Sequence, residues 1–214
     1  MTQEVTTVEE LVELLLKVPI QGRRRLIALS GPPASGKSTL SDELARILTA
    51  KDIICAVVPM DGFHLPNQTL VEAGLLDRKG APETFDAAGF LTLIEKLQSC
   101  EEVDFPTFDR KRDVTIPEGD RVAADCDTVI VEGNYLLFDA PVWRDLRQHW
   151  DWAVALYVPD EVLKGRLLDR WLRLGLTPEI AEQRAEQNDL RNARAVAQSM
   201  LAPDALYRAP TSEP

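Results

Sequence analysis

The chain has 214 residues, a length that suits one domain with a lid or an insertion. Hydrophobic residues make up 45% and charged residues 28%, an ordinary globular composition that excludes disorder and low-complexity fibres. Acidic residues number 35 against 24 basic ones, which gives a formal net charge of −11. This charge disfavours nucleic acid and anionic membranes as partners, so a phosphorylated ligand would need a local cluster of cations.

The cysteines and the N-terminal residues favour a cytoplasmic location. Cys55, Cys100 and Cys126 form no CxxC pair, which argues against a disulfide framework or a zinc site and suits a reducing cytosol. Four glutamates precede the first basic residue, the reverse of the cationic start of a signal peptide. Apolar runs also stay well short of the roughly 18–20 residues that a membrane span requires.

Residues 1–20 are predicted to hold an N-terminal helix. Thr7 and Glu10 form the pattern of a capping box, and apolar residues follow at helical spacing. Because the residue before a proline disfavours the helical conformation, we expect this helix to end at Val18, before Pro19.

Short apolar runs alternate with helical patterns along the rest of the chain. Strands are predicted at residues 26–30, 53–58, 128–131 and 152–158, and helices at residues 37–50, 86–98, 141–149, 160–173 and 178–198. Residues 101–121 interrupt this alternation and are predicted to form a short strand and an irregular excursion. The pattern predicts one α/β domain over residues 1–214, a doubly wound, mainly parallel sheet of about five strands with helices on both faces. Residues 209–214 are expected to form a frayed tail.

Residues 31–38 match the phosphate-binding pattern GxxxxGK[ST] in full, between a predicted strand and a predicted helix. The two glycines let N–H groups of the loop turn toward a phosphate at the positive end of the helix. We expect Lys37 to reach the β- and γ-phosphates of ATP and Ser38 to ligate Mg²⁺. The alternative is a Gly/Pro-rich turn that ends in Lys-Ser by chance. The predicted ATP-binding residues are Gly31, Pro32, Pro33, Ala34, Ser35, Gly36, Lys37, Ser38 and Thr39.

Two carboxylates are predicted to lie near this loop, at the carboxyl ends of neighbouring strands. Glu132 follows the apolar run 129–131 and is expected to act on the Mg²⁺ ion. Asp61 follows the strand at 53–58 and can accept the proton of a hydroxyl group during phosphoryl transfer. The alternatives are a solvated glutamate at a strand end and a simple Asp-Gly turn. The chain has no Asn-Lys-x-Asp motif, so a GTPase is not favoured.

Four ordered motifs resemble those of the P-loop small-molecule kinases that include uridine kinase, phosphoribulokinase and bacterial pantothenate kinase. They are the P-loop itself, Met60-Asp61-Gly62-Phe63-His64-x-Pro-Asn67, Lys79-Gly80-Ala81-Pro82-Glu83-Thr84-Phe85-Asp86 and Val131-Glu132-Gly133-Asn134-Tyr135-Leu136-Leu137. The resemblance covers residues 24–200 and is closest to the fructose transport system kinase group. It implies that Asp61 is the catalytic base and that Glu132 belongs to the magnesium shell.

The resemblance also implies a set of acceptor-binding residues. It places Lys79 on the acceptor or phosphate side. Phe108 and Arg110 match the stretch where the family sets an aromatic residue against its acceptor, and Tyr135 could join that wall. His64 follows Asp61 by three residues and could bond the substrate; a histidine that only satisfies backbone groups is the alternative.

A cationic lid is expected within residues 160–198, which hold the lid and C-terminal helices. Arg166, Arg170 and Arg173 are spaced i, i+4 and i+7, hence on one face of a helix. Their guanidinium groups could stabilise the charge of the transferring phosphoryl group. The alternative is an ordinary solvated helix face.

The sequence thus predicts a kinase that moves the γ-phosphoryl group of ATP, with Mg²⁺, to a hydroxyl of a small neutral metabolite. A sugar is the first choice of acceptor, and pantothenate or a nucleoside is the alternative. A regulatory NTP-binding protein or slow ATPase is the alternative of another class. Homodimers are common in the resembled families.

Overall fold

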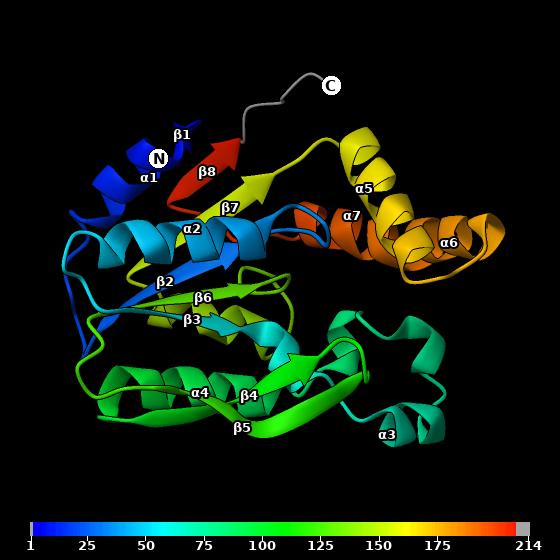
Figure 1. Ribbon diagram of the computed structural model, residues 1–214, viewed down its shortest axis with the longest axis horizontal. Helices are drawn as coiled ribbons and strands as arrows, with labels where there is room; N and C mark the ends of the chain where they lie inside the picture. The colour runs from blue at the N-terminus through cyan, green and yellow to red at the C-terminus, as the bar shows by residue number, and fades with distance from the viewer. Residues whose placement is uncertain (1, 209–214) are drawn as a thin grey trace.

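A parallel sheet lies at the centre of the protein (Figure 1). The computed structural model describes residues 2–208. Across the sheet, the strand order is β1 (Gln3–Val5), β8 (Ala205–Arg208), β7 (Trp152–Tyr157), β2 (Arg25–Ser30), β6 (Thr128–Gly133) and β3 (Cys55–Pro59). Each neighbouring pair is parallel, so all the carboxyl ends meet at one edge, on the right of Figure 1.

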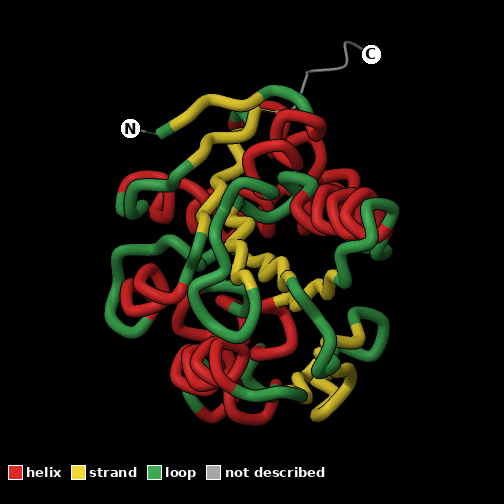
Figure 2. The backbone as a smooth tube through the Cα atoms, turned by 90° about the vertical axis from the view of Figure 1, so that its left-hand side faces the viewer, coloured by secondary structure: helices red, strands yellow, loops and turns green. Residues whose placement is uncertain are grey.

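Both faces of the sheet are covered by helices, as the side view shows (Figure 2). Alternate residues of β2 enter two different cores, because Leu26 and Ala28 point to one face and Ile27 and Leu29 to the other. The helices α1 (Val8–Leu15) and α2 (Lys37–Thr49) pack on the Ile27 side, whereas α4 (Ala87–Ser99) and the 3₁₀ helix Trp143–His149 pack on the Leu26 side. This arrangement confirms the predicted doubly wound α/β fold.

A group of helices lies beyond the carboxyl edge, where the sequence predicted a lid, and we call these helices the lid. It comprises α5 (Asp160–Arg173), α6 (Pro178–Arg184) and α7 (Arg191–Gln198), with a π-helical turn at Ala185–Leu190 that joins α6 to α7. Thr177 caps α6 through the N–H of Ile180, as expected before a proline at the first helical position. Lys164 of α5 bonds Glu186 at 2.8 Å, which ties the lid helices together.

Residues 101–121, where the sequence predicted a short strand and an irregular excursion, form an antiparallel hairpin. Its strands are β4 (Val103–Asp109) and β5 (Val114–Val122). Most of β5 is exposed, so it lacks the alternation of apolar and polar residues that marks a half-buried strand. The hairpin packs on the 3₁₀ turn Met60–Phe63, which follows β3.

Several short elements carry no predictive signal because they span only three to six residues. These are β1 and β8, the helix α3 (Asn67–Glu72), and the 3₁₀ turns Leu76–Arg78 and Pro82–Thr84. With β1 and β8 the main sheet has six strands where about five were predicted, and the strand predicted within residues 101–121 lies outside this sheet. The capping box of Thr7 and Glu10 is present at the start of α1. The tail predicted at 209–214 lies outside the described residues. Across residues 2–208, each helix is too short or too polar to cross a bilayer.

Candidate active site

The pairing register of three strands brings the P-loop, Glu132 and Asp61 together. Glu132 of β6 pairs with Leu29 of β2 on one side and with Pro59 of β3 on the other. The P-loop begins directly after Ser30 at the end of β2, and Asp61 follows Pro59 by two residues. Glu132 therefore lies between the phosphate-binding loop and Asp61, as the strand ends predicted.

The backbone of the P-loop needs its glycines for two different reasons. Gly36 has φ +95°, in the left-handed region that favours glycine, and it forms the N-cap of α2. A Cβ on Gly31 would lie 2.9 Å from Ser35 Oγ and 3.0 Å from Leu156 Cβ. Ser35 Oγ is itself buried and lacks a hydrogen-bond partner within residues 2–208. A buried hydroxyl left without a partner in such a loop fits an oxygen of a bound phosphate.

Lys37 lies at the centre of a buried polar cluster behind the loop. Its Nζ donates to the carbonyl of Pro32 at 3.0 Å and to Asn134 Oδ1 at 2.8 Å. Burial lowers the pKa of Lys37 and raises the pKa of Glu132, and each charge partly offsets the shift of the other. Ser38 Oγ donates to Glu132 Oε1 at 2.9 Å. The two predicted Mg²⁺ ligands are thus in contact.

The donor set at this point fits a magnesium ion. Mg²⁺ takes oxygen ligands and usually binds through one or two carboxylates together with substrate phosphates. Ser38 and Glu132 supply a hydroxyl and a carboxylate beside the P-loop. Nowhere in the described ranges do three or more His, Cys, Asp or Glu side chains gather as a metal cage. The arrangement therefore suits an ion that arrives with a nucleotide.

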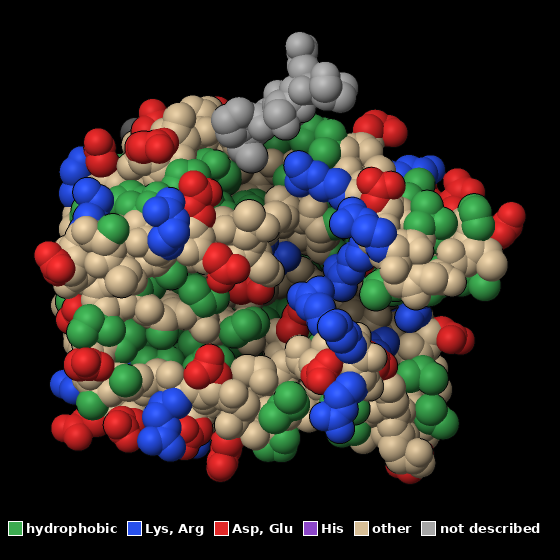
Figure 3. All heavy atoms as spheres, in the orientation of Figure 1, with side chains coloured by type: hydrophobic (Ala, Val, Ile, Leu, Met, Phe, Trp, Pro, Cys, Tyr) green, Lys and Arg blue, Asp and Glu red, His purple; other side chains and the backbone are tan. Residues whose placement is uncertain are grey.

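A cavity of about 1180 Å³ opens between this edge of the sheet and the lid. Lysine and arginine side chains gather around the corresponding hollow on the surface (Figure 3). Small-ligand pockets measure about 300–1,000 Å³, so the cavity has room for nucleotide phosphates and a second molecule. Its wall includes Lys37, Asp61 and Glu132 on the phosphate side, and His64, Phe108 and other residues of the hairpin and α3 on the far side. We call the far side the acceptor end.

Asp61 lies at the boundary of the phosphate side, and His64 begins the acceptor end next to it. Asp61 Oδ2 accepts from Arg110 NH2 of the hairpin at 2.5 Å. The His64 ring stacks on Phe85, with ring centroids 4.1 Å apart, and lies 4.8 Å from the ring of Phe108. Burial lowers the pKa of His64 to about 4, so the ring is neutral at pH 7.

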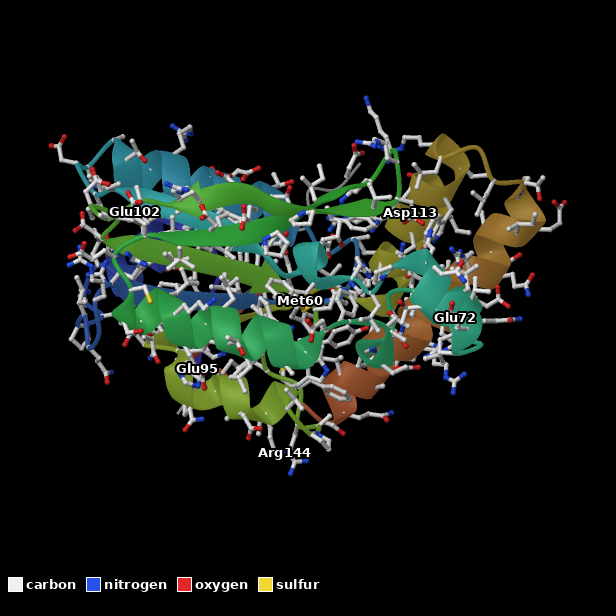
Figure 4. The ribbon with its side chains drawn as sticks, turned by 90° about the horizontal axis from the view of Figure 1, so that it is seen from below. Met60, Glu72, Glu95, Glu102, Asp113 and Arg144 are labelled. Carbon is white, nitrogen blue, oxygen red and sulfur yellow. The ribbon has the colours of Figure 1, made fainter. Side chains whose placement is uncertain are left out.

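Three polar residues from three elements meet at the outer part of this end. Lys79 Nζ donates to Asn67 Oδ1 at 2.6 Å and to Asp113 Oδ1 at 2.8 Å. Asn67 Nδ2 donates to Asp113 Oδ2 at 2.7 Å, which closes the ring of bonds. Figure 4 shows Asp113 at the tip of the hairpin, at the same end of the molecule as Glu72 of α3, with Glu102 at the opposite end. We call Asn67, Lys79 and Asp113 the polar triad.

Tyr135 does not take the place that the resemblance implied. Its side chain is 1% exposed and packs against Phe85 and Trp143 in the core. Its hydroxyl donates to the carbonyl of Gly80. Tyr135 therefore supports the segment after Lys79 from behind, and Phe85 supplies the aromatic wall.

The three predicted lid arginines separate into different places. Arg170 lines the large cavity, and Arg166 NH1 donates to the carbonyls of Ala34 and Ser35 in the P-loop at 3.4 Å. Arg173 is exposed and its Nε donates to the carbonyl of Asp169 in its own helix. Although the three share a helix face, Arg173 lies about 4.5 Å further along the axis than Arg170. Arg173 is therefore outside the wall of the cavity, and its role in the charge clamp stays a prediction.

Further polar residues complete the site, and no role was predicted for three of them, Asn67, Asn134 and Arg78. Asn134 bonds Lys37, and both Asn134 and Asn67 belong to the quoted motifs, so their motif positions were the available signal. Arg78 donates to Asn188 and Asn192 in the lid at 2.8 and 2.9 Å. Asn188 Nδ2 in turn donates to the carbonyl of Lys79 at 2.9 Å. These bonds fasten the lid to the acceptor end.

A second hollow of about 380 Å³ lies on the other side of the P-loop. Its wall combines Gly36 and Thr39 from the start of α2 with Tyr157 and Val158 from the end of β7, and Arg166 from the lid. This hollow adjoins the P-loop but not Asp61.

The chain is similar to several known proteins. The model of the AAA domain family matches residues 27–187. A "putative uridine kinase" of Schizosaccharomyces pombe is 32% identical over 94% of this chain and 90% of its own length. Pantothenate kinases of Streptococcus pneumoniae are 39% identical over 70% of this chain and half of their own length. The solved structure of a "putative fructose transport system kinase" from Silicibacter sp. TM1040 superposes with a TM-score of 0.91 and 49% identity, covering 94% of this chain and 99% of that one.

Proposed function

The chain belongs to the AAA domain family and is a P-loop kinase of the uridine kinase and pantothenate kinase type, and we propose that it phosphorylates a hydroxyl of a small neutral metabolite. ATP is the proposed donor and a sugar the first choice of acceptor. The observation that carries the proposal is the convergence of the P-loop, Glu132 and Asp61 on one cavity.

Asp61 is the proposed base of the reaction. A carboxylate at this position can accept the proton of the acceptor hydroxyl while its oxygen attacks the γ-phosphorus and the bond to the β-phosphate oxygen breaks. Arg110 holds Asp61 Oδ2, which leaves Oδ1 for the hydroxyl. Lys37 and Arg170 lie on the phosphate side and offset the charge of the transferring group. A Mg²⁺ ion held by Ser38 and Glu132 would neutralise phosphate charge there.

The charges of the acceptor end support a neutral acceptor. Asp61 is paired with Arg110, and Lys79 is paired with Asp113, so these charges cancel locally. His64 adds a neutral ring because burial lowers its pKa. An anionic acceptor would therefore find no net positive charge among these five residues. Lys37 and Arg170 face the phosphates of the donor, and Arg78, Arg184 and Arg191 line other parts of the cavity.

The variant Asp61→Asn tests the proposal. It keeps the shape of the side chain but removes the proton acceptor, so turnover should fall by about 10²–10⁴-fold while ATP binding stays intact. The measurements are coupled ADP release and ATP titration by calorimetry. Asp145→Asn is the matched control, because Asp145 is exposed and is not part of the cavity wall, so turnover should stay unchanged. Unchanged turnover in Asp61→Asn contradicts the kinase mechanism.

The acceptor is found by a screen of ADP release over sugars, nucleosides and pantothenate. A nucleoside is the second candidate, since the S. pombe relative matches nearly the whole chain. Stimulation by D-fructose or another sugar supports the first choice, and stimulation by uridine alone supports the second. If every alcohol leaves ADP release at the level of water, a regulatory NTP-binding protein or slow ATPase is the better description.

A further inference from the structure

The polar triad is not used by the mechanism above, although it lines the same cavity as Asp61. Lys79 is almost covered, with 11% of its side chain exposed, whereas Asp113 is 52% exposed and accessible from the cavity. Asp113 lies in the turn of the hairpin with φ +56°, a left-handed conformation that aspartate tolerates in turns, and the bonds to Lys79 and Asn67 hold its side chain.

The triad retains hydrogen-bonding capacity after its internal bonds are counted. Each oxygen of Asp113 accepts one bond from the triad and keeps a lone pair, and Asn67 Oδ1 keeps another. Lys79 Nζ and Asn67 Nδ2 each keep one N–H. Within the described part of the chain, three acceptor sites and two donor sites therefore stay open. A mixed set of this kind suits hydroxyl groups, because each hydroxyl both donates and accepts.

The same count argues against an anionic group at this position. A phosphate or carboxylate has no proton to donate to the three open acceptor sites. It would also meet the carboxylate of Asp113, whose charge cancels that of Lys79. Two hydroxyls on adjacent carbons, by contrast, can bond Asp113 and Asn67 at the same time. They can donate to the open acceptor sites and accept from the open donor sites.

Aromatic rings connect the triad with Asp61. Lys79 Nζ lies 5.1 Å from the centroid of Phe108, and the ring of Phe108 lies 4.8 Å from that of His64. His64 follows Asp61 by three residues in the turn that begins at Met60. An acceptor can therefore lay its C–H face on these rings, with one hydroxyl at Asp61 and others at the triad.

We propose that the Asn67–Lys79–Asp113 triad selects acceptors that carry two adjacent hydroxyl groups, bound apart from the hydroxyl that receives the phosphoryl group. This inference rests on the proposed kinase function and narrows its acceptor to a diol-bearing class, which includes sugars, polyols and ribosides. Asp113 and Asn67 act as specificity-determining residues, and Lys79 positions both.

The test compares an acceptor with its deoxy analogues. D-fructose, D-mannitol and uridine are assayed first, and the best of them is compared with analogues that lack one hydroxyl of a pair. The wild-type protein should prefer the diol by about 10–100-fold in kcat/KM, the effect of one hydrogen bond to a charged group. Asp113→Asn should reduce that preference to a few-fold and raise the KM of the acceptor, with the KM of ATP unchanged. Asn67→Ser is a second variant with the same expectation.

Asp125→Asn is the matched control. Asp125 is an exposed residue in the loop after β5, so this change removes the same charge outside the cavity and should leave the preference intact. If the deoxy analogues have the same kcat/KM as the diol, the inference is wrong but the proposed kinase function is unaffected. The inference is also overturned if Asp113→Asn keeps the preference for the diol. The same holds if this variant loses activity only together with a fall in Tm or a rise in the KM of ATP. If the wild type phosphorylates no hydroxyl compound, the proposed function fails and the inference fails with it.

Discussion

At the phosphate end of the cavity, the side chains come from segments that directly continue two adjacent strands of the sheet. Lys37 and Ser38 follow β2, and Glu132 belongs to β6, whose pairing with β2 is regular through all six residues of each strand. At the acceptor end, the side chains come from α3, the turn after it, and the tip of a hairpin outside the main sheet. The first end is positioned by buried strands, the second by contacts between segments distant in sequence.

This difference suggests a division of tasks between the two ends. The chemistry of a nucleotide phosphate is the same for every kinase of this kind, so a rigid loop serves it without adjustment. The acceptor differs from enzyme to enzyme, and segments outside the sheet can change without disturbing the core. Mutations at the phosphate end should therefore remove activity and leave the fold intact. Mutations at the acceptor end should change how the acceptor is used, and they should lower stability only where they push the hairpin away from the Asp61 turn.

The largest effect is expected for Lys37→Met. Methionine fills a similar volume but supplies no positive charge to the β- and γ-phosphates, so turnover should fall by about 10²–10³-fold or more. Because β2 and β6 hold the loop, the melting temperature should change by only a few degrees. Steady-state ADP release and thermal unfolding followed by circular dichroism measure the two quantities.

Lys51→Met is the control for this variant, since Lys51 is an exposed residue just after α2. It should match the wild type in both measurements. A cooperative loss of the fold in Lys37→Met would contradict the view that the strands alone position the phosphate end.

An intermediate effect is expected for Gly62→Ala, which lies next to Asp61. A Cβ there would come 1.9 Å from the carbonyl oxygen of Pro106, so the hairpin must move away from the turn that carries Asp61. Overpacking of this kind costs about 1–3 kcal/mol of unfolding free energy. The KM of the acceptor should rise as well, because Arg110 and Asp113 move with the hairpin. Chemical denaturation and acceptor kinetics measure both effects.

Gly165→Ala is the control, and it should change the stability of the protein in the opposite direction. Gly165 lies within α5, and its Cβ would meet nothing within 4 Å among the described residues. Alanine there should stabilise the protein by about 0.5–1 kcal/mol, because it restricts the unfolded chain and favours the helix. If Gly62→Ala instead unfolds like the wild type, the hairpin is not held against the Asp61 turn.

The sequence predicted the phosphate end almost completely because each of its residues has a local signal. The P-loop has a fixed spacing, and Glu132 and Asp61 follow apolar runs that mark buried strands, whose carboxyl ends must meet at one edge. The kinase family was confirmed by the comparisons. The roles of individual side chains stay predictions until they are tested by substitution.

The acceptor end was predicted only in part, for physical reasons. The mostly exposed β5 has no periodic apolar face, and α3 has only six residues. The contact of Asp113 with Lys79 depends on how the hairpin closes over α3, and its positive φ is set by that closure. Tyr135 and Phe85 are both aromatic, and only three-dimensional packing decides which one faces the cavity.

The smallest effect is expected for Arg173→Gln, and it tests whether the lid belongs to the phosphate end. Arg173 is exposed and bonds a carbonyl of its own helix, so kcat and KM should stay within about twofold of the wild type. Arg170 lines the cavity, and burial lowers the pKa of its guanidinium group. Arg170→Gln should therefore reduce kcat by about 10–100-fold, the loss of one charge-assisted bond to the transferring phosphoryl group. Equal losses in both variants would mean that the lid helices turn when the site closes and bring Arg173 toward the phosphates. The charge clamp would then form only in the closed lid and would not be a fixed part of the site, as the P-loop is.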